Sequence, residues 1–304
     1  MDSAVITGAN GLIGSALAKH LSGLGIPLLC LGRKVLTQDR VRDHFGETSE
    51  YAPLPMDKIA CLPEILQSFS WRPGSKTVFF HFAWSGKNGL TDGSLDEQLN
   101  NAAWAAEAVK VAKNIGCKKF VNSGSIQESF VEQHAAEKGC REIDSRQLNY
   151  ALAKLASRDM CKMTAYIECI DYVHTRISVP LASDLSKGTY IARTLRQIMD
   201  GELFEHPHNE ALYDVVLLED VTRAYCEIGK QGRNQRDYFI GPSQPAPLRQ
   251  HFEIFKHLVH GEDGGVYSQR CKTPHFFDVQ PLYGDTGFVP TLGLKDIISK
   301  ALDS

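Results

Sequence analysis

Residues 3–14 read Ser3-Ala4-Val5-Ile6-Thr7-Gly8-Ala9-Asn10-Gly11-Leu12-Ile13-Gly14, and this stretch decides the fold of the chain. Its apolar first half is typical of a buried parallel strand, and apolar residues at helical spacing continue from Leu12 to Leu24. A glycine-rich turn between a strand and a helix lets the backbone approach a pyrophosphate at the helix N-terminus. We therefore predict a dinucleotide-binding turn rather than a glycine-lined turn without a ligand. Its candidate cofactor-binding residues are Thr7, Gly8, Asn10, Gly11, Leu12, Ile13 and Gly14.

A second motif, Tyr150-Ala151-Leu152-Ala153-Lys154, lies near the middle of the chain. Because Tyr150 and Lys154 are four residues apart, they share one face of a helix. A free tyrosine has a pKa of about 10, and a neighbouring ammonium lowers that pKa by favouring the phenolate. With Ser125 bonding the substrate oxygen, these residues form a site for carbonyl and alcohol chemistry. Taken singly, Ser125 is also a plausible turn residue and the Tyr/Lys spacing arises by chance, but their order after the glycine turn favours a functional site.

Several motifs resemble a known family. The spacing Gly-x-x-Gly-x-x-Gly is similar to that of the short-chain dehydrogenase/reductase superfamily, and the later motifs resemble its extended branch of nucleotide-sugar epimerases, dehydratases and reductases. His81-Phe82-Ala83-Trp84 is similar to the family's His-Leu-Ala-Ala, and Asn101 follows where the family places a structural asparagine. Residues 120–125 resemble the strand that delivers the catalytic serine, and residues 285–290 resemble a signature of sugar-nucleotide members.

This resemblance implies an NAD(P)-dependent oxidoreductase with Ser125, Tyr150 and Lys154 as its catalytic residues. Tyr150 would protonate the new alkoxide, Ser125 would orient the carbonyl, and Lys154 would also hold the ribose hydroxyls. Trp84 and Gln127 are candidates for the wall of the substrate site, although Trp84 also fits a plain core residue. The resemblance implies further cofactor contacts from Phe82, Ala83, Trp84, Ser123, Tyr150, Lys154 and Pro180.

The residues after the second predicted strand, at 28–31, bear on the choice of cofactor. NAD-binding chains usually place an acidic residue there, whereas this chain continues Gly32-Arg33-Lys34. Arg33 can clamp a 2′-phosphate, and Lys34 can add a point charge. We therefore predict NADP(H), with NAD(H) as the alternative in which both cations are simply solvated. Asp57 resembles the family's adenine-side aspartate, or else it is the N-cap of the next helix.

Three departures from the family pattern narrow the predicted function. Residues 125–128 read Ser-Ile-Gln-Glu, without the Asp-Glu pair that follows the serine or threonine of dehydratases, so we do not expect a lyase. Residues 177–181 read Ile-Ser-Val-Pro-Leu where the family often reads Asn-x-Tyr-Gly-Pro, which leaves the backbone near the nicotinamide amide unplaced. Residues 213–214 lack the arginine that many members place on the substrate diphosphate. Arg193 or Arg196 would substitute for it, or they are plain solvent-facing residues.

Composition places the chain among ordinary globular proteins. Its 304 residues are 43% hydrophobic and 23% charged, enough for a substantial core, and the net charge of -3 offers no general attraction to nucleic acid. The first strand begins within the first few residues and no apolar run reaches membrane-spanning length, so we expect a cytoplasmic protein. Eight cysteines without metal or Cys-x-x-Cys spacing predict thiols, and His206 and His208 alone do not indicate a metal site.

Strand and helix patterns alternate from Ala4 to Met163, and another strand follows at residues 172–177. This alternation predicts an α/β fold, a Rossmann-type doubly wound parallel sheet with a small C-terminal substrate-binding lobe. We expect residues 1–176 to form the NAD(P)-binding domain. Residues 177–304 would mostly form the substrate-binding lobe, with about 212–240 returning to the first domain.

These observations favour NADPH-dependent reduction of the 4-keto group of a nucleotide-activated deoxysugar. The nearest alternative is a nucleotide-sugar 4-epimerase, which uses the same three residues with a tightly held NAD. An alternative of another class is a non-catalytic NADP(H)-sensing protein, although such proteins can lose the tyrosine that this chain keeps as Tyr150. The resemblance also allows a homodimer through a two-helix face that includes the helix of Tyr150.

Overall fold

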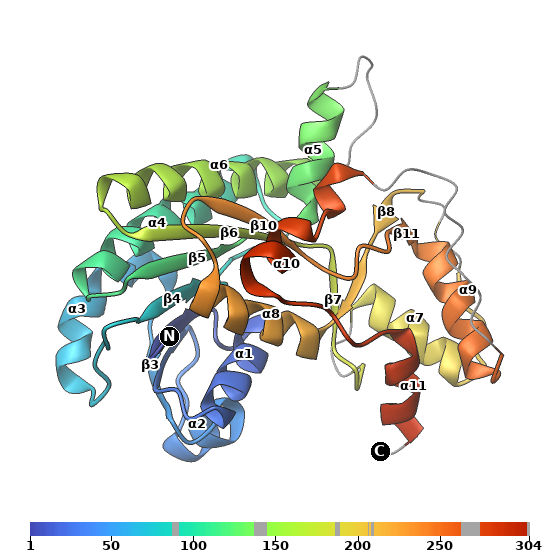
Figure 1. Cartoon of the computed structure of the whole chain (residues 1–304), viewed down its shortest axis with the longest axis horizontal. Helices are drawn as coiled ribbons and strands as arrows, with labels where there is room; N and C mark the ends of the chain where they lie inside the picture. The colour runs from blue at the N-terminus through green and yellow to red at the C-terminus, as the bar shows by residue number, and fades with distance from the viewer. Residues whose placement is uncertain are drawn as a thin grey trace. The chain divides into compact units, whose positions relative to one another are not determined.

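The structure is a computed structural model that describes residues 1–86, 91–136, 145–185, 189–205, 207, 210–262 and 274–302 (Figure 1). Among these residues, seven strands form one sheet in the order β10-β6-β5-β4-β1-β2-β3. The successive pairs from β6 through β5, β4, β1 and β2 to β3 are all parallel. The strand order reverses between β1 and β4, which is the switch point where open α/β sheets bind ligands. The predicted Rossmann-type fold is confirmed.

The strands of this sheet form because their sequences are short apolar runs that bury both faces. Every residue of β1, β2, β4 and β5 is buried, as expected for a parallel sheet covered on both sides. Phe79, Phe120 and Tyr172 stack across three neighbouring strands, with ring centroids 5.2 and 6.5 Å apart. The strands are β1 (Ala4–Thr7), β2 (Leu28–Gly32), β3 (Ser49–Pro53), β4 (Val78–His81), β5 (Lys119–Ser123), β6 (Asp171–Ile177) and β10 (Arg236–Ile240).

The connecting helices begin and end at recognisable signals. The longest of those that link the first six strands, α6 (Ser145–Ile167), packs against α4 (Leu95–Asn114) (Figure 1). A capping box starts α4: the Ser94 hydroxyl accepts the Glu97 N–H, and the Glu97 carboxylate accepts the Ser94 N–H at 2.8 Å. The other helices here are α1 (Leu12–Gly23), α2 (Gln38–Phe45), η1 (Met56–Cys61), α3 (Leu62–Ile65), η2 (Leu66–Ser68) and α5 (Ile126–Ala136).

The chain divides into two compact units. The first comprises Met1–Ile177 and Tyr225–Tyr238, and the second comprises Ser178–Ala224 and Phe239–Ser304. The chain therefore re-enters the first unit within α8 (Leu218–Gln231) and leaves it within β10. The roles predicted for the two parts of the chain, cofactor binding and substrate binding, stay predictions.

The second unit has its own core, in which Leu195, Leu217, Phe252, Phe255 and Ile297 are among the buried residues. In its described part, β7 (Val179–Leu181) pairs with β9 (Val215–Leu217) in parallel, and β8 (Leu212–Tyr213) pairs with β11 (Ala246–Pro247) antiparallel. The remaining elements are α7 (Tyr190–Met199), α9 (Leu248–Val259), η3 (His275–Phe277), α10 (Gln280–Thr286) and α11 (Leu294–Leu302).

The cysteines within the described residues are free thiols, and Cys140 and Cys271 lie outside those residues, as do His206 and His208. No group of three or more metal-ligating side chains occurs in the described part of the chain. None of the described helices has both the length and the apolar character needed to cross a bilayer. The predicted homodimer and cytoplasmic location stay predictions.

Candidate active site

The glycine turn joins β1 to α1 and is closely packed. Gly8 has a φ of 67°, in the left-handed region, and a Cβ there would lie 2.7 Å from the backbone nitrogen of Ala83. A Cβ on Gly14 would lie 2.4 Å from the carbonyl oxygen of Gly8. Only glycine at these two positions lets the turn, the helix and the end of β4 approach so closely.

The N-terminus of α1 is open to a ligand. Its N-cap is the exposed Gly11, which has no side chain to bond the amides of the first turn. Leu12 and Ile13 carry amides of that turn, and such N–H groups at the positive end of a helix dipole bind phosphates well. The glycine cradle and the uncapped helix therefore fit the pyrophosphate of a dinucleotide.

Thr7 ties the glycine turn to the end of β4. Its hydroxyl oxygen accepts the Ala83 N–H at 3.3 Å and lies 3.0 Å from Nδ1 of His81, while its carbonyl oxygen accepts the Phe82 N–H at 3.3 Å. Burial, followed by the charge of Lys154, lowers the pKa of His81 to about 3, so this imidazole is neutral. The structure thus brings together the cofactor candidates Thr7, Phe82 and Ala83.

Tyr51 links the glycine turn to the end of β2. Its hydroxyl lies 3.0 Å from Oδ1 of Asn10 and 2.5 Å from the carbonyl oxygen of Lys34. Arg33 and Lys34 are exposed, and Arg33 lies 3.5 Å from the Ser85 hydroxyl. Sequence reasoning missed Tyr51, because a tyrosine within a strand gives no sign of its distant partners. The link places both cations beside the predicted dinucleotide site.

Asp57, Pro180 and Asn101 lie outside the glycine turn, and each has a different position. Asp57 is exposed in the first turn of η1, whose N-cap is Pro55, so the structure does not place Asp57 at an N-cap. Its predicted contact with adenine stays a prediction. Pro180 belongs to β7 in the second unit, and its predicted cofactor contact also stays a prediction. Asn101 clamps the backbone of Ser85 through bonds of 2.8 and 2.9 Å, which is a structural role.

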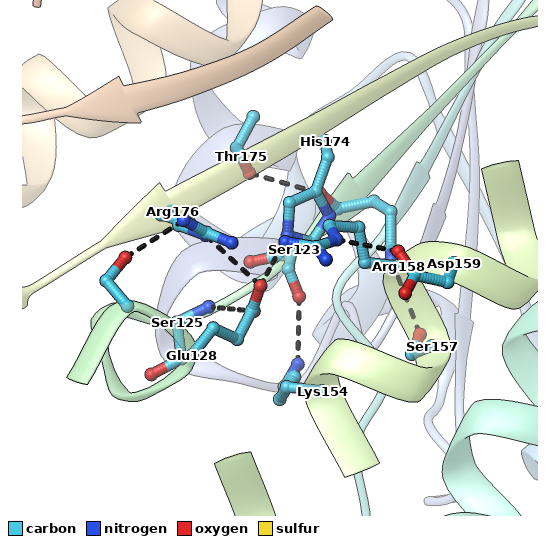
Figure 2. Close-up of polar contacts among 12 residues, drawn as sticks. Ser123, Ser125, Glu128, Lys154, Ser157, Arg158, Asp159, His174, Thr175 and Arg176 are labelled. Atoms are coloured by element: carbon cyan, nitrogen blue, oxygen red, sulfur yellow. Dashed lines mark hydrogen bonds and ion pairs between the residues drawn. The ribbon is translucent and has the colours of Figure 1, made fainter. Parts of the chain in front are cut away.

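The three catalytic candidates meet beyond the carboxyl end of β5. Ser125 immediately precedes α5, and Tyr150 and Lys154 lie on α6. The side chains of Ser125 and Tyr150 hydrogen-bond each other. Figure 2 shows that Nζ of Lys154 donates to the carbonyl oxygen of Ser123, at 2.8 Å. Ser123 also accepts a hydrogen bond from the Tyr225 hydroxyl through its own hydroxyl oxygen at 3.1 Å. Sequence spacing therefore located side chains that the fold brings together.

The acidity of Tyr150 differs from the expectation based on its neighbour Lys154. Burial raises the pKa of Tyr150 above its ordinary value; the hydrogen bond from Ser125 opposes this rise, and the Glu128 carboxylate adds to it. The Lys154 ammonium lies 5.8 Å from the centroid of the tyrosine ring and is bonded to the backbone instead. The expected lowering of the pKa is therefore wrong for this structure, and Tyr150 is a neutral phenol at pH 7.

Trp84 provides the surface on which the Lys154 ammonium rests. Nζ of Lys154 lies 3.8 Å from the centroid of the indole, and the indole meets the Tyr150 ring edge-on at a centroid distance of 5.8 Å. Its Nε1 donates to Oε1 of Gln98 at 2.8 Å, which fixes the ring. Burial lowers the pKa of Lys154 to about 8, with the Glu128 carboxylate opposing the fall. Trp84 is half-buried and contacts both proton-bearing residues, unlike a plain core residue.

Glu128 is a buried carboxylate that sequence reasoning noted only as a departure from the dehydratase pattern. Figure 2 shows it between Ser125 on one side and His174 and Arg176 on the other. Its Oε1 accepts the Ser125 N–H at 2.7 Å, and its Oε2 lies 2.9 Å from Nε2 of His174 and 3.2 Å from Nε of Arg176. Burial alone would raise the pKa of Glu128, but His174, Arg176 and the Ser125 N–H bring it down to about 2. The Ser-x-x-Glu spacing of a capping box was the available signal.

Candidates in the second unit have mainly structural contacts. Arg196 donates to the carbonyl oxygen of Leu185 at 2.6 Å, whereas Arg193 is exposed on α7. Asp214 is buried and accepts the N–H groups of Ser243 and Gln244 at 2.9 Å each. Burial raises the pKa of Asp214 to about 7 despite these two bonds. The predicted substitution of either arginine for the missing diphosphate contact stays a prediction.

Together, the nucleotide-binding turn and the Ser/Tyr/Lys group define a short-chain dehydrogenase/reductase of the extended type. The chain belongs to the NAD dependent epimerase/dehydratase family, whose sequence profile matches residues 4–241. The resemblance seen in the motifs is thus confirmed. No curated protein sequence matches the chain at a significant level. Family membership supports a nicotinamide dinucleotide as the cofactor.

Solved structures that resemble this chain include two UDP-sugar 4-epimerases and an enzyme solved with NAD+ and UDP. UDP-glucose 4-epimerase of Thermotoga maritima, solved with UDP-glucose, has a TM-score of 0.69 and 15% identity over 99% of this chain and 97% of that one. The Bordetella bronchiseptica enzyme WbmF, solved with NAD+ and UDP, has a TM-score of 0.72 and 15% identity over 99% and 91%. UDP-N-acetylglucosamine 4-epimerase of Methanobrevibacter ruminantium M1, solved with UDP-N-acetylmuramic acid, has a TM-score of 0.73 and 16% identity over 99% and 98%. At this level of identity they show a common fold.

Proposed function

We propose that this protein is an NADPH-dependent reductase of the 4-keto group of a nucleotide-activated deoxysugar. The observation that carries this proposal is the protonation state of Tyr150, a buried neutral phenol hydrogen-bonded to Ser125. A neutral phenol can give its proton to a new alkoxide, because an alkoxide is a much stronger base than a phenolate, whereas without losing that proton it cannot act as a base toward an alcohol. This protonated state supports reduction as the proposed direction.

Each residue of the site has a role in this reaction. Tyr150 donates its hydroxyl proton to the carbonyl oxygen as that oxygen becomes an alkoxide, and the Ser125 hydroxyl orients the same oxygen. Lys154, with a pKa of about 8, is mostly protonated at pH 7 and can hold the ribose hydroxyls. A bound nicotinamide dinucleotide supplies the hydride. The first-turn amides of α1, from Leu12 onward, hold its pyrophosphate.

The choice of NADPH over NADH is supported by the end of β2. Arg33 and Lys34 are exposed there, beside the Asn10–Tyr51 link to the glycine turn. A guanidinium binds a 2′-phosphate through charge-assisted hydrogen bonds, whereas a carboxylate in its place would repel that group. The basic pair therefore favours the phosphorylated cofactor.

A 4-epimerase is the second candidate, because two of the similar structures are UDP-sugar 4-epimerases and WbmF was solved with NAD+. An epimerase would use Ser125, Tyr150 and Lys154 with a tightly held NAD and would return every hydride to the same sugar. The two candidates therefore differ in net redox change. A reductase consumes one NADPH for each keto sugar, while an epimerase consumes none.

The test is to mix the purified protein with NADPH and a nucleotide 4-keto-6-deoxysugar and to follow both NADPH absorbance and the sugar product. We expect NADPH loss equal to product formed. We expect Tyr150→Phe to lower turnover by about 10²- to 10⁴-fold while keeping cofactor affinity, since it removes only the transferable proton. Epimerisation of a UDP-sugar by a copurified NAD, without NADPH loss, would establish the second candidate instead. A Tyr150→Phe variant with near wild-type turnover would show that this tyrosine is structural.

A further inference from the structure

The first turn of α5 is held by a buried charge. The Glu128 side chain is fully buried, and a carboxylate in such a place is costly unless charges and hydrogen bonds compensate it. Its compensation comes from β6, where His174 is also fully buried and Arg176 is mostly buried. Arg176 in turn lies 2.9 Å from Glu132, one helical turn further along α5.

Glu128 controls the position of Ser125 directly. Its carboxylate accepts the Ser125 N–H at 2.7 Å, and its own N–H donates to the Ser125 carbonyl oxygen at 3.2 Å. The Ser125 hydroxyl oxygen accepts the Gln127 N–H at 3.3 Å. Because that bond uses a lone pair of the hydroxyl, the hydroxyl proton is left to be donated toward Tyr150 or a substrate oxygen. The side chain of Ser125 is thereby oriented by bonds within the first turn of α5.

The same carboxylate acts electrostatically on both proton-bearing residues of α6. Burial is the largest influence that raises the pKa of Tyr150, and the Glu128 carboxylate adds to this rise, while the bond from Ser125 opposes it. Glu128 also opposes the lowering of the pKa of Lys154 by burial. The titratable and charged groups around this cluster include His81 on β4, Glu132 on α5, Tyr150, Lys154, Arg158 and Cys161 on α6, Tyr172, His174 and Arg176 on β6, and Tyr225 on α8.

We propose that Glu128 is a positioning residue of the site, held in place by His174 and Arg176. It orients Ser125 through the backbone, and its negative charge favours the protonated forms of Tyr150 and Lys154. This inference rests on the proposed reduction, in which Tyr150 must carry a proton and Lys154 a charge. It assigns to Glu128 the task of preparing the site for proton donation.

Glu128→Gln tests the role of the charge, because glutamine keeps an oxygen for the Ser125 N–H. Without the negative charge, both groups lose their protons more easily. We expect the titration midpoint of Lys154, about 8 in the wild type, to fall by about one pH unit. The measurement is ¹³Cε NMR of labelled lysine across pH, with the Lys154 signal assigned by its absence from Lys154→Met. The alkaline limb of the pH profile of kcat/KM should move to lower pH as well.

Glu132→Gln is the matched control, since Glu132 shares the partner Arg176 and the same helix but lies one helical turn further from Ser125 than Glu128 does. We expect it to leave the Lys154 midpoint unchanged. Glu128→Met fills the same space without a charge and repeats the test if the glutamine variant does not fold. An unchanged Lys154 midpoint in a folded Glu128→Gln or Glu128→Met protein would overturn the proposal. The NMR measurement needs no substrate, so its outcome is independent of whether the protein reduces a keto sugar.

Discussion

At the scale of single residues, burial and local contacts decide what each ionisable side chain can do. Tyr150 and Lys154 have the same helical spacing that predicted a lowered tyrosine pKa, yet burial moves the pKa of Tyr150 upward and that of Lys154 downward. The upward shift keeps Tyr150 a neutral phenol, the state that proton donation requires, whereas the downward shift leaves Lys154 still mostly charged at pH 7. Arg33, in contrast, is exposed and can adapt its long side chain to a ligand.

Arg33→Ala tests the proposed preference for NADPH. Losing a charge-assisted contact with the 2′-phosphate should weaken NADPH binding by roughly 1 to 3 kcal/mol and leave NADH binding nearly unchanged. The measurement is a fluorescence titration of each cofactor. Arg40→Ala, which removes an exposed cation from α2, is the control and should affect neither cofactor. Equal losses for NADPH and NADH in Arg33→Ala would contradict the preference.

At the scale of elements, the glycine turn, the strand before it and the helix after it depend on how closely their backbones approach. Gly14 lies against the Gly8 carbonyl, and Gly8 lies against the backbone of Ala83, so β1, α1 and the end of β4 are in close contact. Gly23, at the end of α1, is different because a Cβ there would meet no atom within 4 Å. Two glycines of one helix therefore have opposite tolerance to substitution.

Gly14→Ala should destabilise the protein and weaken cofactor binding. The new Cβ would lie 2.4 Å from the Gly8 carbonyl oxygen, which is backbone and cannot rotate away. Overpacking of this kind costs about 1 to 3 kcal/mol of unfolding free energy. Gly23→Ala is the matched control and should stabilise the protein by about 0.5 to 1 kcal/mol, because it lowers the entropy cost of ordering the helix. Urea unfolding measures both, and equal effects of the two substitutions would refute the packing argument.

At the scale of the whole molecule, hydrogen bonds between segments that are distant in the sequence stabilise each unit. In the first unit, Lys119 on β5 donates to the carbonyl oxygens of Ile228, Gly229 and Gly232, with the bond to Gly232 at 2.7 Å. In the second unit, Asp220 accepts the N–H groups of Thr291 and Leu292 at 2.8 Å each. Helix α8 carries Ile228 and Gly229, which accept bonds in the first unit, and Asp220, which accepts bonds in the second. The helix therefore stabilises each unit.

Asp214 makes the stability of the second unit depend on pH. Burial raises the folded-state pKa of Asp214 to about 7, above its ordinary value of 3.8, so the folded protein binds this proton more tightly than the unfolded chain. The resulting stabilisation is complete below pH 3.8 and is lost as the pH rises through about 7. The unfolding free energy of the wild type, relative to that of Asp214→Asn, should therefore fall between pH 5 and pH 8, by at most about 1.4 kcal/mol per pH unit. Urea unfolding at both pH values measures this, and a difference that does not vary with pH would refute it.

Much of the fold and part of the candidate site followed from the sequence. The strand before Gly8, the helix after Gly11 and the pairing of Tyr150 with Lys154 were predicted from patterns that span only a few residues. The contact of Lys154 with Trp84, at 3.8 Å from the ring centroid, and the link from Tyr51 to Asn10 were not predictable in this way. Both contacts join side chains that are far apart in the sequence, and a pattern of a few neighbouring residues cannot predict such a contact.

The sequence by itself determined that this protein has a Rossmann-type fold and which side chains are candidates for its chemistry. Strand burial, helical spacing and the glycine turn are local properties, so they can be read along the chain. Only the tertiary structure decided the protonation states, which depend on burial and on charges from distant segments. His174 meets Glu128 across 46 residues of sequence, and through Glu128 it reaches Ser125. The effect of the Glu128 carboxylate on Tyr150 therefore exists only in the folded chain. Folding removes this carboxylate from water and surrounds it with His174, Arg176 and Ser125.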